Sequence, residues 1–225
     1  MKHLSKAIIA AAGAALVTQA AQASFSVNDL YLGLTYSTAS SDYIIDLGQA
    51  SALTGSTSVV NLSSDFSLST FNSVFTGGAT GVNMAVVGGN GNFGSYNIYA
   101  TQTRVGGAGN AAVAGSDLTG LGHSQGAIGG AVQALTSPTD WPAANNGVAV
   151  ASKSFTSAVG PAINATDFVS KSGVGASAFT PIGSSGIIYE DLWTANVANA
   201  YSYQGYFTLD TTGASPSLTF TSVNA

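Results

Sequence analysis

The chain has 225 residues, enough for one mid-sized domain with its own hydrophobic core. Charged residues make up only 7% of it, whereas Gly, Ser and Thr together exceed a third, which excludes a coiled coil and ordinary charged disorder. Ten acidic residues against five basic ones give a formal charge of −5, so the chain lacks the cations needed to bind nucleic acid through its phosphates.

Residues 1–23 have the pattern of a secretory signal peptide. Lys2 and Lys6 lie at the start of the chain and residues 7–17 are apolar. The segment ends in Ala-Gln-Ala, which has small residues at the two positions that a signal peptidase recognises. The apolar run is about half the length that crosses a bilayer, so we prefer a signal peptide to a permanent anchor or a buried helix. We predict that residues 24–225 form a single exported domain, secreted or held at a bacterial cell surface.

The exported part is acidic and has no cysteine. Arg104, Lys153 and Lys171 remain against ten acidic residues, a formal charge of −7. Without disulfides the fold depends on core burial, which suits a bacterial export route. No stretch after the leader approaches 18 uninterrupted apolar residues, so we expect no membrane-spanning helix in the mature chain.

The first half of the exported chain predicts strands and one short helix. Residues 27–36 alternate as a half-buried strand that returns as residues 43–47 in a hairpin, and residues 59–62 form a short third strand. Leu68, Phe71, Val74 and Phe75 recur at near-helical spacing after a capping Ser67.

The second half is also dominated by strands. We predict paired strands over 82–87 and 95–103 around a Gly-rich loop, a helix over 124–135, irregular structure over 161–185, and strands over 148–150, 186–193, 201–209 and 218–223. The fold class is therefore mainly β: one antiparallel, sandwich-like domain with two short helices, with α+β as the alternative.

Two glycine motifs resemble functional signatures. Residues 122–126 fit the Gly-x-Ser-x-Gly turn of serine hydrolases, but His123 is the only histidine after the leader and none follows Ser124 to act as the base. A helix cap at Ser124 is the preferred reading, and a serine hydrolase the less favoured one. Residues 89–94 match Gly-x-Gly-x-x-Gly, yet a strand follows where a dinucleotide site needs a helix.

The residue types limit metal and cofactor chemistry. One histidine and no cysteine leave zinc and redox metals without their usual ligands, so we expect no cofactor and no catalytic residue. Calcium stays open, because it accepts carboxylates, although the candidates have no diagnostic spacing and solvated turns or strand edges explain them better: Asp42, Asp46, Glu190 and Asp191.

Aromatic residues cluster near the C-terminus, namely Tyr189, Trp193, Tyr201, Tyr203 and Tyr206. Exposed rings of this kind suit a glycan-binding module, in which they stack on sugars. Cross-strand packing is the alternative that we favour, because regular alternation buries Tyr201 and Tyr203 beside Phe207 and Leu209.

Several short motifs fall in the order found in bacterial exported proteins associated with PEP-CTERM sorting. They are Leu30-Tyr31-Leu32-Gly33-Leu34, Asp42-Tyr43-Ile44-Ile45-Asp46-Leu47-Gly48, Phe71-Asn72-Ser73-Val74-Phe75, Val86-Val87-Gly88, Ile98-Tyr99-Ala100 and Gly205-Tyr206-Phe207-Thr208-Leu209. The chain resembles that group over most of its exported part. The resemblance implies a surface or matrix protein tied to exopolysaccharide, and it supplies no catalytic residue.

Two departures from that group's pattern stand out. Leu34 and Met84 occupy positions where aromatic residues are expected, and no Pro-Glu-Pro motif, apolar helix and basic cluster of a sorting tail precede Ala225. Either such a tail is absent from this sequence or the protein is released rather than processed at the envelope.

These observations together predict a non-enzymatic exported surface or matrix protein. Its expected partners are exopolysaccharide or copies of itself, since low charge and uncovered strands favour edge-to-edge association. The glycan-binding module that uses the C-terminal aromatic residues is the alternative.

Overall fold

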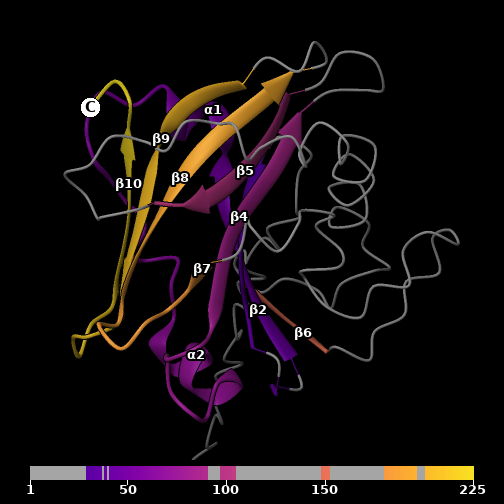
Figure 1. Cartoon of the computed structure of the whole chain (residues 1–225), viewed down its shortest axis with the longest axis vertical. Coiled ribbons are helices and arrows are strands. Elements are labelled where there is room, and N and C mark those ends of the chain that lie inside the picture. The colour runs from indigo at the N-terminus through magenta and orange to yellow at the C-terminus, as the bar shows by residue number, and fades with distance from the viewer. Residues whose placement is uncertain are drawn as a thin grey trace, which may run out of the picture.

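The computed structural model describes residues 29–36, 38–39, 41–90, 97–104, 148–152, 180–196 and 201–225. Within them lie ten strands and two short helices, labelled in Figure 1. In chain order they are β1 (Asp29–Thr35), β2 (Ser41–Gln49), α1 (Ala50–Thr54), β3 (Val60–Asn61), α2 (Leu68–Val74), β4 (Asn83–Asn90), β5 (Asn97–Thr103), β6 (Val148–Ser152), β7 (Thr180–Pro181), β8 (Ile187–Asn196), β9 (Tyr201–Asp210) and β10 (Ser217–Ser222).

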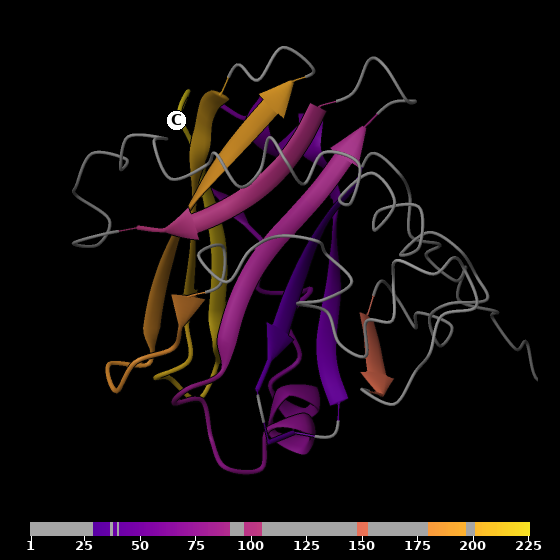
Figure 2. The same cartoon turned by 45° about the vertical axis from the view of Figure 1, so that its right-hand side comes forward.

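All ten strands belong to one antiparallel sheet. Nine follow each other in the order β3-β10-β9-β8-β5-β4-β1-β2-β6, and β7 pairs with β4 beside this path. The sheet curls into a half-barrel, which Figures 1 and 2 show from two sides. The predicted mainly β, antiparallel class with two short helices is confirmed, and the sandwich-like core is enclosed by a single curled sheet.

The predicted strand pairs are also found. β1 and β2 form the N-terminal hairpin, β4 pairs with β5, and β9 pairs with β10 at the C-terminal end. β6 confirms the strand predicted over residues 148–150. The helix predicted over residues 124–135 and most of the irregular region over 161–185 lie outside the described residues.

The hydrophobic core fills the inner side of the half-barrel. Leu30, Leu32 and Leu34 of β1 point to this side, because successive side chains of a strand alternate between its faces. The other large core residues come from the strands around them: Tyr43, Ile45, Leu47, Met84, Val86, Ile188, Leu192, Phe207, Leu209, Leu218 and Phe220. Full burial of each such side chain contributes about 1.5–3 kcal/mol, so the core can hold the fold without disulfides.

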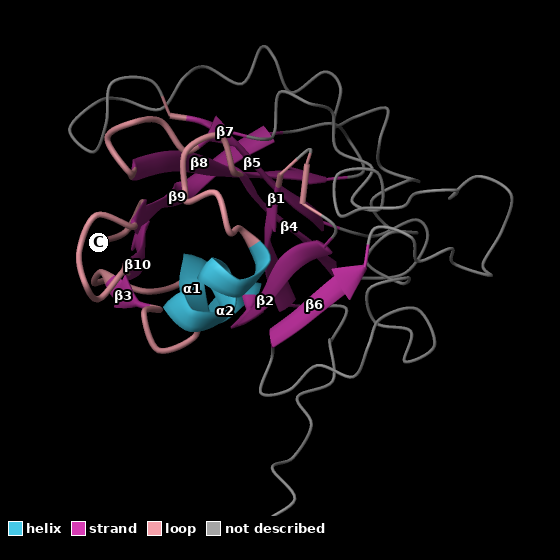
Figure 3. Ribbon diagram, turned by 90° about the horizontal axis from the view of Figure 1, so that it is seen from below, coloured by secondary structure: helices cyan, strands magenta, loops and turns pink. Residues whose placement is uncertain are grey.

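Both helices lie on the concave side of the curled sheet, as Figure 3 shows. α1 contributes Leu53 and α2 contributes Phe71 to the core. The predicted cap of α2 is confirmed, since the Ser67 hydroxyl accepts a hydrogen bond from the Thr70 amide at 3.2 Å. The Ser67 amide in turn donates to the Tyr43 hydroxyl at 2.8 Å, which ties the start of α2 to β2. Neither described helix is long and apolar enough to cross a membrane.

The central strands are buried on both faces, which corrects one expectation. The sequence predicts a half-buried strand near residues 27–36, but every residue of β1 is buried. β1 lies in the middle of the sheet between β2 and β4, and on its outer face Tyr31 pairs with Val87 and Gly33 with Ile44. All these apolar outer residues are almost fully buried as well.

One carboxyl group is buried on the inner side of β8. Glu190 alternates with the core residues Ile188 and Leu192 and is completely buried. Neither of its carboxyl oxygens makes a hydrogen bond within the described part of the chain. Burial raises the pKa of Glu190 well above its usual value, and the nearby polar groups of Thr101 and Thr180 offset this increase only in part.

This burial makes the stability of the protein fall as the pH rises. Above the unfolded pKa of Glu190 the unfolded chain releases this proton while the folded chain keeps it, so ionisation favours unfolding up to the folded pKa. We predict that Glu190→Gln raises the free energy of unfolding at pH 8 and changes it little at pH 4. Urea titrations at both pH values measure this. An equal effect of the substitution at both values would contradict the prediction.

Candidate functional site

β9 contains one extra residue opposite β8. Leu192 of β8 pairs with Gly205 of β9, but the next residue of β8, Trp193, pairs with Tyr203. Gln204 is therefore the extra residue of a β-bulge. A bulge of this kind shifts the alternation of side chains by one position, so residues before and after it change faces.

The bulge overturns the expectation that Tyr201 and Tyr203 are buried in the core. Phe207 and Leu209 point inward and are fully buried, as predicted. Tyr201 and Tyr203 lie on the other side of the bulge and face outward, and both are only half-buried. The expected burial beside Phe207 and Leu209 is therefore wrong for these two residues, whereas the expected cross-strand packing is found for Tyr203, whose ring lies against Trp193 of β8.

Gly205 allows the two strands on either side of β9 to stay close at the bulge. Its φ is +139°, a value that side-chain-bearing residues rarely adopt. A Cβ atom at this position would lie 2.2 Å from the carbonyl oxygen of Thr221 in β10. The local backbone thus requires glycine.

All five predicted glycan-binding residues consequently face the outer side of β8 and β9. We call this set, Tyr189, Trp193, Tyr201, Tyr203 and Tyr206, the outer aromatic patch. Its four tyrosines are half-buried and Trp193 is 9% exposed. The positions from Tyr189 to the Ala195 partner of Tyr201 extend along β8 for about 20 Å at the usual strand rise.

The centre of the patch is an aromatic pair. The rings of Trp193 and Tyr203 lie directly opposite each other on β8 and β9, with their centroids 5.4 Å apart and their planes tilted by 57°. Tilted pairs at this distance are favourable because the edge of one ring meets the face of the other.

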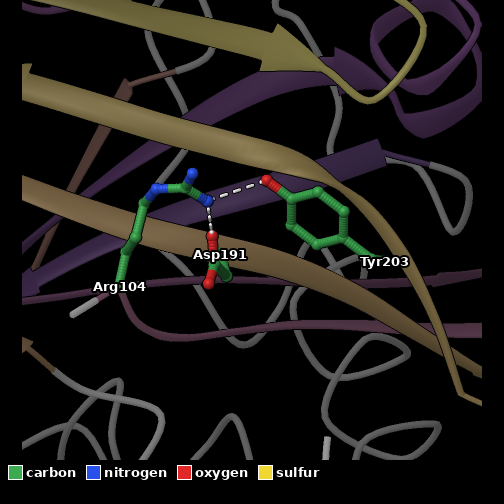
Figure 4. A network of polar contacts seen from close by, with 3 residues as sticks. All are labelled: Arg104, Asp191 and Tyr203. Carbon is green, nitrogen blue, oxygen red and sulfur yellow. Dashed lines mark hydrogen bonds and ion pairs between the residues drawn. The ribbon is translucent and has the colours of Figure 1, made fainter. Parts of the chain in front are cut away.

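A buried ion pair supports this centre (Figure 4). The Arg104 guanidinium donates through Nη1 to Asp191 Oδ1 and to the Tyr203 hydroxyl, the latter at 2.9 Å. The two charged side chains are 5% and 1% exposed. The guanidinium carbon also lies 4.3 Å from the ring centroid of Tyr206, a cation–π contact. Arg104 therefore fixes two of the aromatic rings in place.

The pKa shifts of Arg104 and Tyr203 agree with an ion pair between Arg104 and Asp191. Burial by itself lowers the pKa of Arg104, but the hydrogen bond and charge of Asp191 outweigh it and raise this pKa. Burial also raises the pKa of Tyr203, and the charge of Asp191 adds to the effect. Both groups keep their protons at neutral pH, so the arginine remains a cation and the tyrosine a hydrogen-bond donor or acceptor.

The indole of Trp193 contains a polar atom without a partner. Its Nε1 is buried and makes no hydrogen bond within the described residues. A buried donor without an acceptor costs about 1–3 kcal/mol. Buried oxygens of Gln102 and Glu190 also lack a partner among the described residues, so this atom does not by itself mark a binding site.

Arg104 is a residue in contact with the aromatic rings of the candidate site that the sequence does not single out. It comes directly after β5, and it is the one basic residue that falls in the described part of the chain. A buried arginine needs a carboxylate partner, so a single arginine in such a weakly charged part of the chain is itself a sign of a buried ion pair. The identity of that partner, 87 residues away in the sequence, depends on strand order.

The calcium candidates do not come together. Glu190 and Asp191 are neighbours in β8 and point to opposite faces, while Asp42 and Asp46 belong to β2. Within the described residues no three His, Cys, Asp or Glu side chains are close enough to hold a metal ion. Three of the four, Asp42, Glu190 and Asp191, are fully buried, so the expected solvated positions are wrong for them.

The two glycine motifs have different outcomes. Ser124 and His123 lie outside the described residues. In the other motif Gly89 belongs to β4, residues 91–94 lie outside the described residues, and the next described element is the strand β5.

Comparisons with protein-family models, with curated proteins and with solved structures find no match to this chain.

The ion pair provides a test of the site's construction. Replacing one partner leaves the other charge buried and without its opposite charge, so we predict that Arg104→Leu lowers the free energy of unfolding by about 3–5 kcal/mol. The double variant Arg104→Leu/Asp191→Leu removes both charges and is expected to lose clearly less. Guanidinium titrations measure both values. A single variant as stable as the wild type, or a double variant less stable than the single one, would contradict this.

Proposed function

We propose that this protein is an exported, non-enzymatic surface or matrix protein that binds polysaccharide through the outer aromatic patch. The observation that carries the proposal is the bulge at Gln204, which brings Tyr201 and Tyr203 to the same outer face as Trp193 and Tyr206. Rings that only stabilised the core would not gather on this side of the sheet.

The chemistry of the patch suits a sugar polymer. Aromatic rings offer flat apolar faces on which the C–H face of a sugar can stack, while tyrosine hydroxyls offer hydrogen bonds to sugar hydroxyls. The patch extends along two neighbouring strands. Such a shape favours a chain of several sugar units over a single small molecule.

The sequence gives independent support for this function. The predicted leader of residues 1–23 directs the chain out of the cell, where exopolysaccharide is found. The resemblance to PEP-CTERM-associated proteins also implies a matrix protein tied to exopolysaccharide. Neither feature identifies the sugar.

Self-association is a secondary proposal, and the sheet edge at β3 and β10 does not favour it. β3 pairs with only part of β10, and the neighbouring residue of β10 bonds to the segment that follows β3. The Leu218 carbonyl accepts from the Leu62 amide at 2.8 Å, and the Leu218 amide donates to the Ser63 hydroxyl at 3.1 Å. A second copy of the chain would therefore have to pair elsewhere, since this part of the edge is already covered.

Truncation of one half-buried ring tests the binding proposal. We predict that Tyr206→Ala weakens binding to a retained polysaccharide on the order of tenfold, as expected for the loss of an aromatic contact worth somewhat more than about 1 kcal/mol. Affinity gel electrophoresis through gels containing different neutral and acidic polymers measures retention and identifies those that bind.

Two matched variants control this experiment. Tyr206→Phe keeps the ring and its contact with Arg104, so its binding should stay close to that of the wild type. Asn72 is exposed on α2, which lies on the concave side of the sheet and therefore opposite the patch, and Asn72→Ser should not affect binding. Wild-type binding by a folded Tyr206→Ala variant, or retention of the wild type by no polymer, would contradict the proposed function.

A further inference from the structure

Arg104, the one cation that the described residues place beside the outer aromatic patch, is already neutralised, and from this we infer that the bound polysaccharide is uncharged. This inference rests on the proposed function and specifies the ligand class of the same site. Neutral polymers are recognised by stacking and hydroxyl hydrogen bonds. Polymers with carboxylate or sulfate groups bind more weakly.

The geometry of Arg104 leads to this conclusion. Its guanidinium bonds to Asp191 and to the Tyr203 hydroxyl, its face covers the Tyr206 ring, and its side chain is 5% exposed. An acidic sugar that bonded to this arginine would have to compete with Asp191. The carboxylate of Asp191, which is 1% exposed, would then lose its opposite charge inside the protein. The site therefore offers an anion no accessible opposite charge within the described residues.

The negative net charge of the whole chain also disfavours the binding of acidic polymers. Ten acidic residues against five basic ones give −5, and two of the basic residues belong to the predicted leader. A polyanion approaching such a protein is repelled, most strongly at low ionic strength where screening is weak. A neutral chain experiences no such repulsion.

The groups that remain for recognition are uncharged. They are the rings of the four half-buried tyrosines and the hydroxyls of Tyr189, Tyr201 and Tyr206. Hydroxyl groups of a neutral sugar can both donate to and accept from such partners. This set matches a polymer of hexose units without acidic substituents.

Pairs of polymers with the same backbone test the inference. Hydroxyethyl cellulose with carboxymethyl cellulose, dextran with carboxymethyl dextran, and guar with carboxymethyl guar each differ mainly in charge. We expect affinity electrophoresis at 20 mM salt to show at least about tenfold weaker retention by the charged member of whichever pair binds. Retention by the neutral member should change less than about twofold between 20 and 500 mM salt.

An added cation provides the sharpest control. Thr208 is half-buried on the outer face of β9, opposite Tyr189 of the patch. Thr208→Lys places an unpaired positive charge there, whereas Thr208→Gln adds similar bulk without charge. The lysine variant should gain affinity for the carboxymethyl polymer at 20 mM salt and lose the gain at 500 mM, and the glutamine variant should not. No gain by a folded lysine variant would overturn the role assigned to charge.

The outcomes separate this inference from the proposed function. If carboxymethyl polymers bind the wild type more tightly than their neutral partners, and Tyr206→Ala removes that binding, the patch binds polysaccharide but the inference is wrong. If no polymer of either kind is retained, the proposed function fails and the inference fails with it. Preferential binding of a neutral polymer that depends on Tyr206 supports both.

Discussion

The extra residue Gln204 in β9 decides which side of the half-barrel carries the aromatic side chains. In a regular ladder Tyr203 would pair with Thr194 and point into the core, next to Phe207. The bulge instead places Tyr203 opposite Trp193 on the outer face, while Phe207 stays inside. The same strand therefore contributes Phe207 and Leu209 to the core and Tyr201, Tyr203 and Tyr206 to the candidate site.

A buried ion pair holds two rings of the candidate site in place. Arg104, paired with Asp191, bonds to the Tyr203 hydroxyl and contacts the Tyr206 ring, so these rings keep their positions before any ligand arrives. Rings fixed in advance lose little conformational entropy on binding. Asp191 both helps to hold Arg104 against the rings and neutralises its charge. The rigidity of the patch and its proposed preference for uncharged polymers therefore have the same origin.

The sequence predicts much of the fold because its local signals are strong. Alternation and turn residues identify the strands around Leu30 and Ile45, and Ser67 marks the start of α2. α1 was missed, since five residues without a side-chain cap give no helical period. Alternation fails at Tyr203, because a bulge changes the register without changing the residue types around it, although Gly205 marks the place. The partners of Arg104 depend on strand order, which local patterns do not contain.

The position of the Tyr203 ring is the most direct test of this account, and nuclear Overhauser contacts in the isotopically labelled protein report it. The account predicts contacts between the ring protons of Tyr203 and those of Trp193, since their centroids are 5.4 Å apart on the outer face. Contacts of Tyr203 with the methyl groups of Leu192, together with none to Trp193, would place the ring in the core. That result would contradict the bulge and the binding surface built on it.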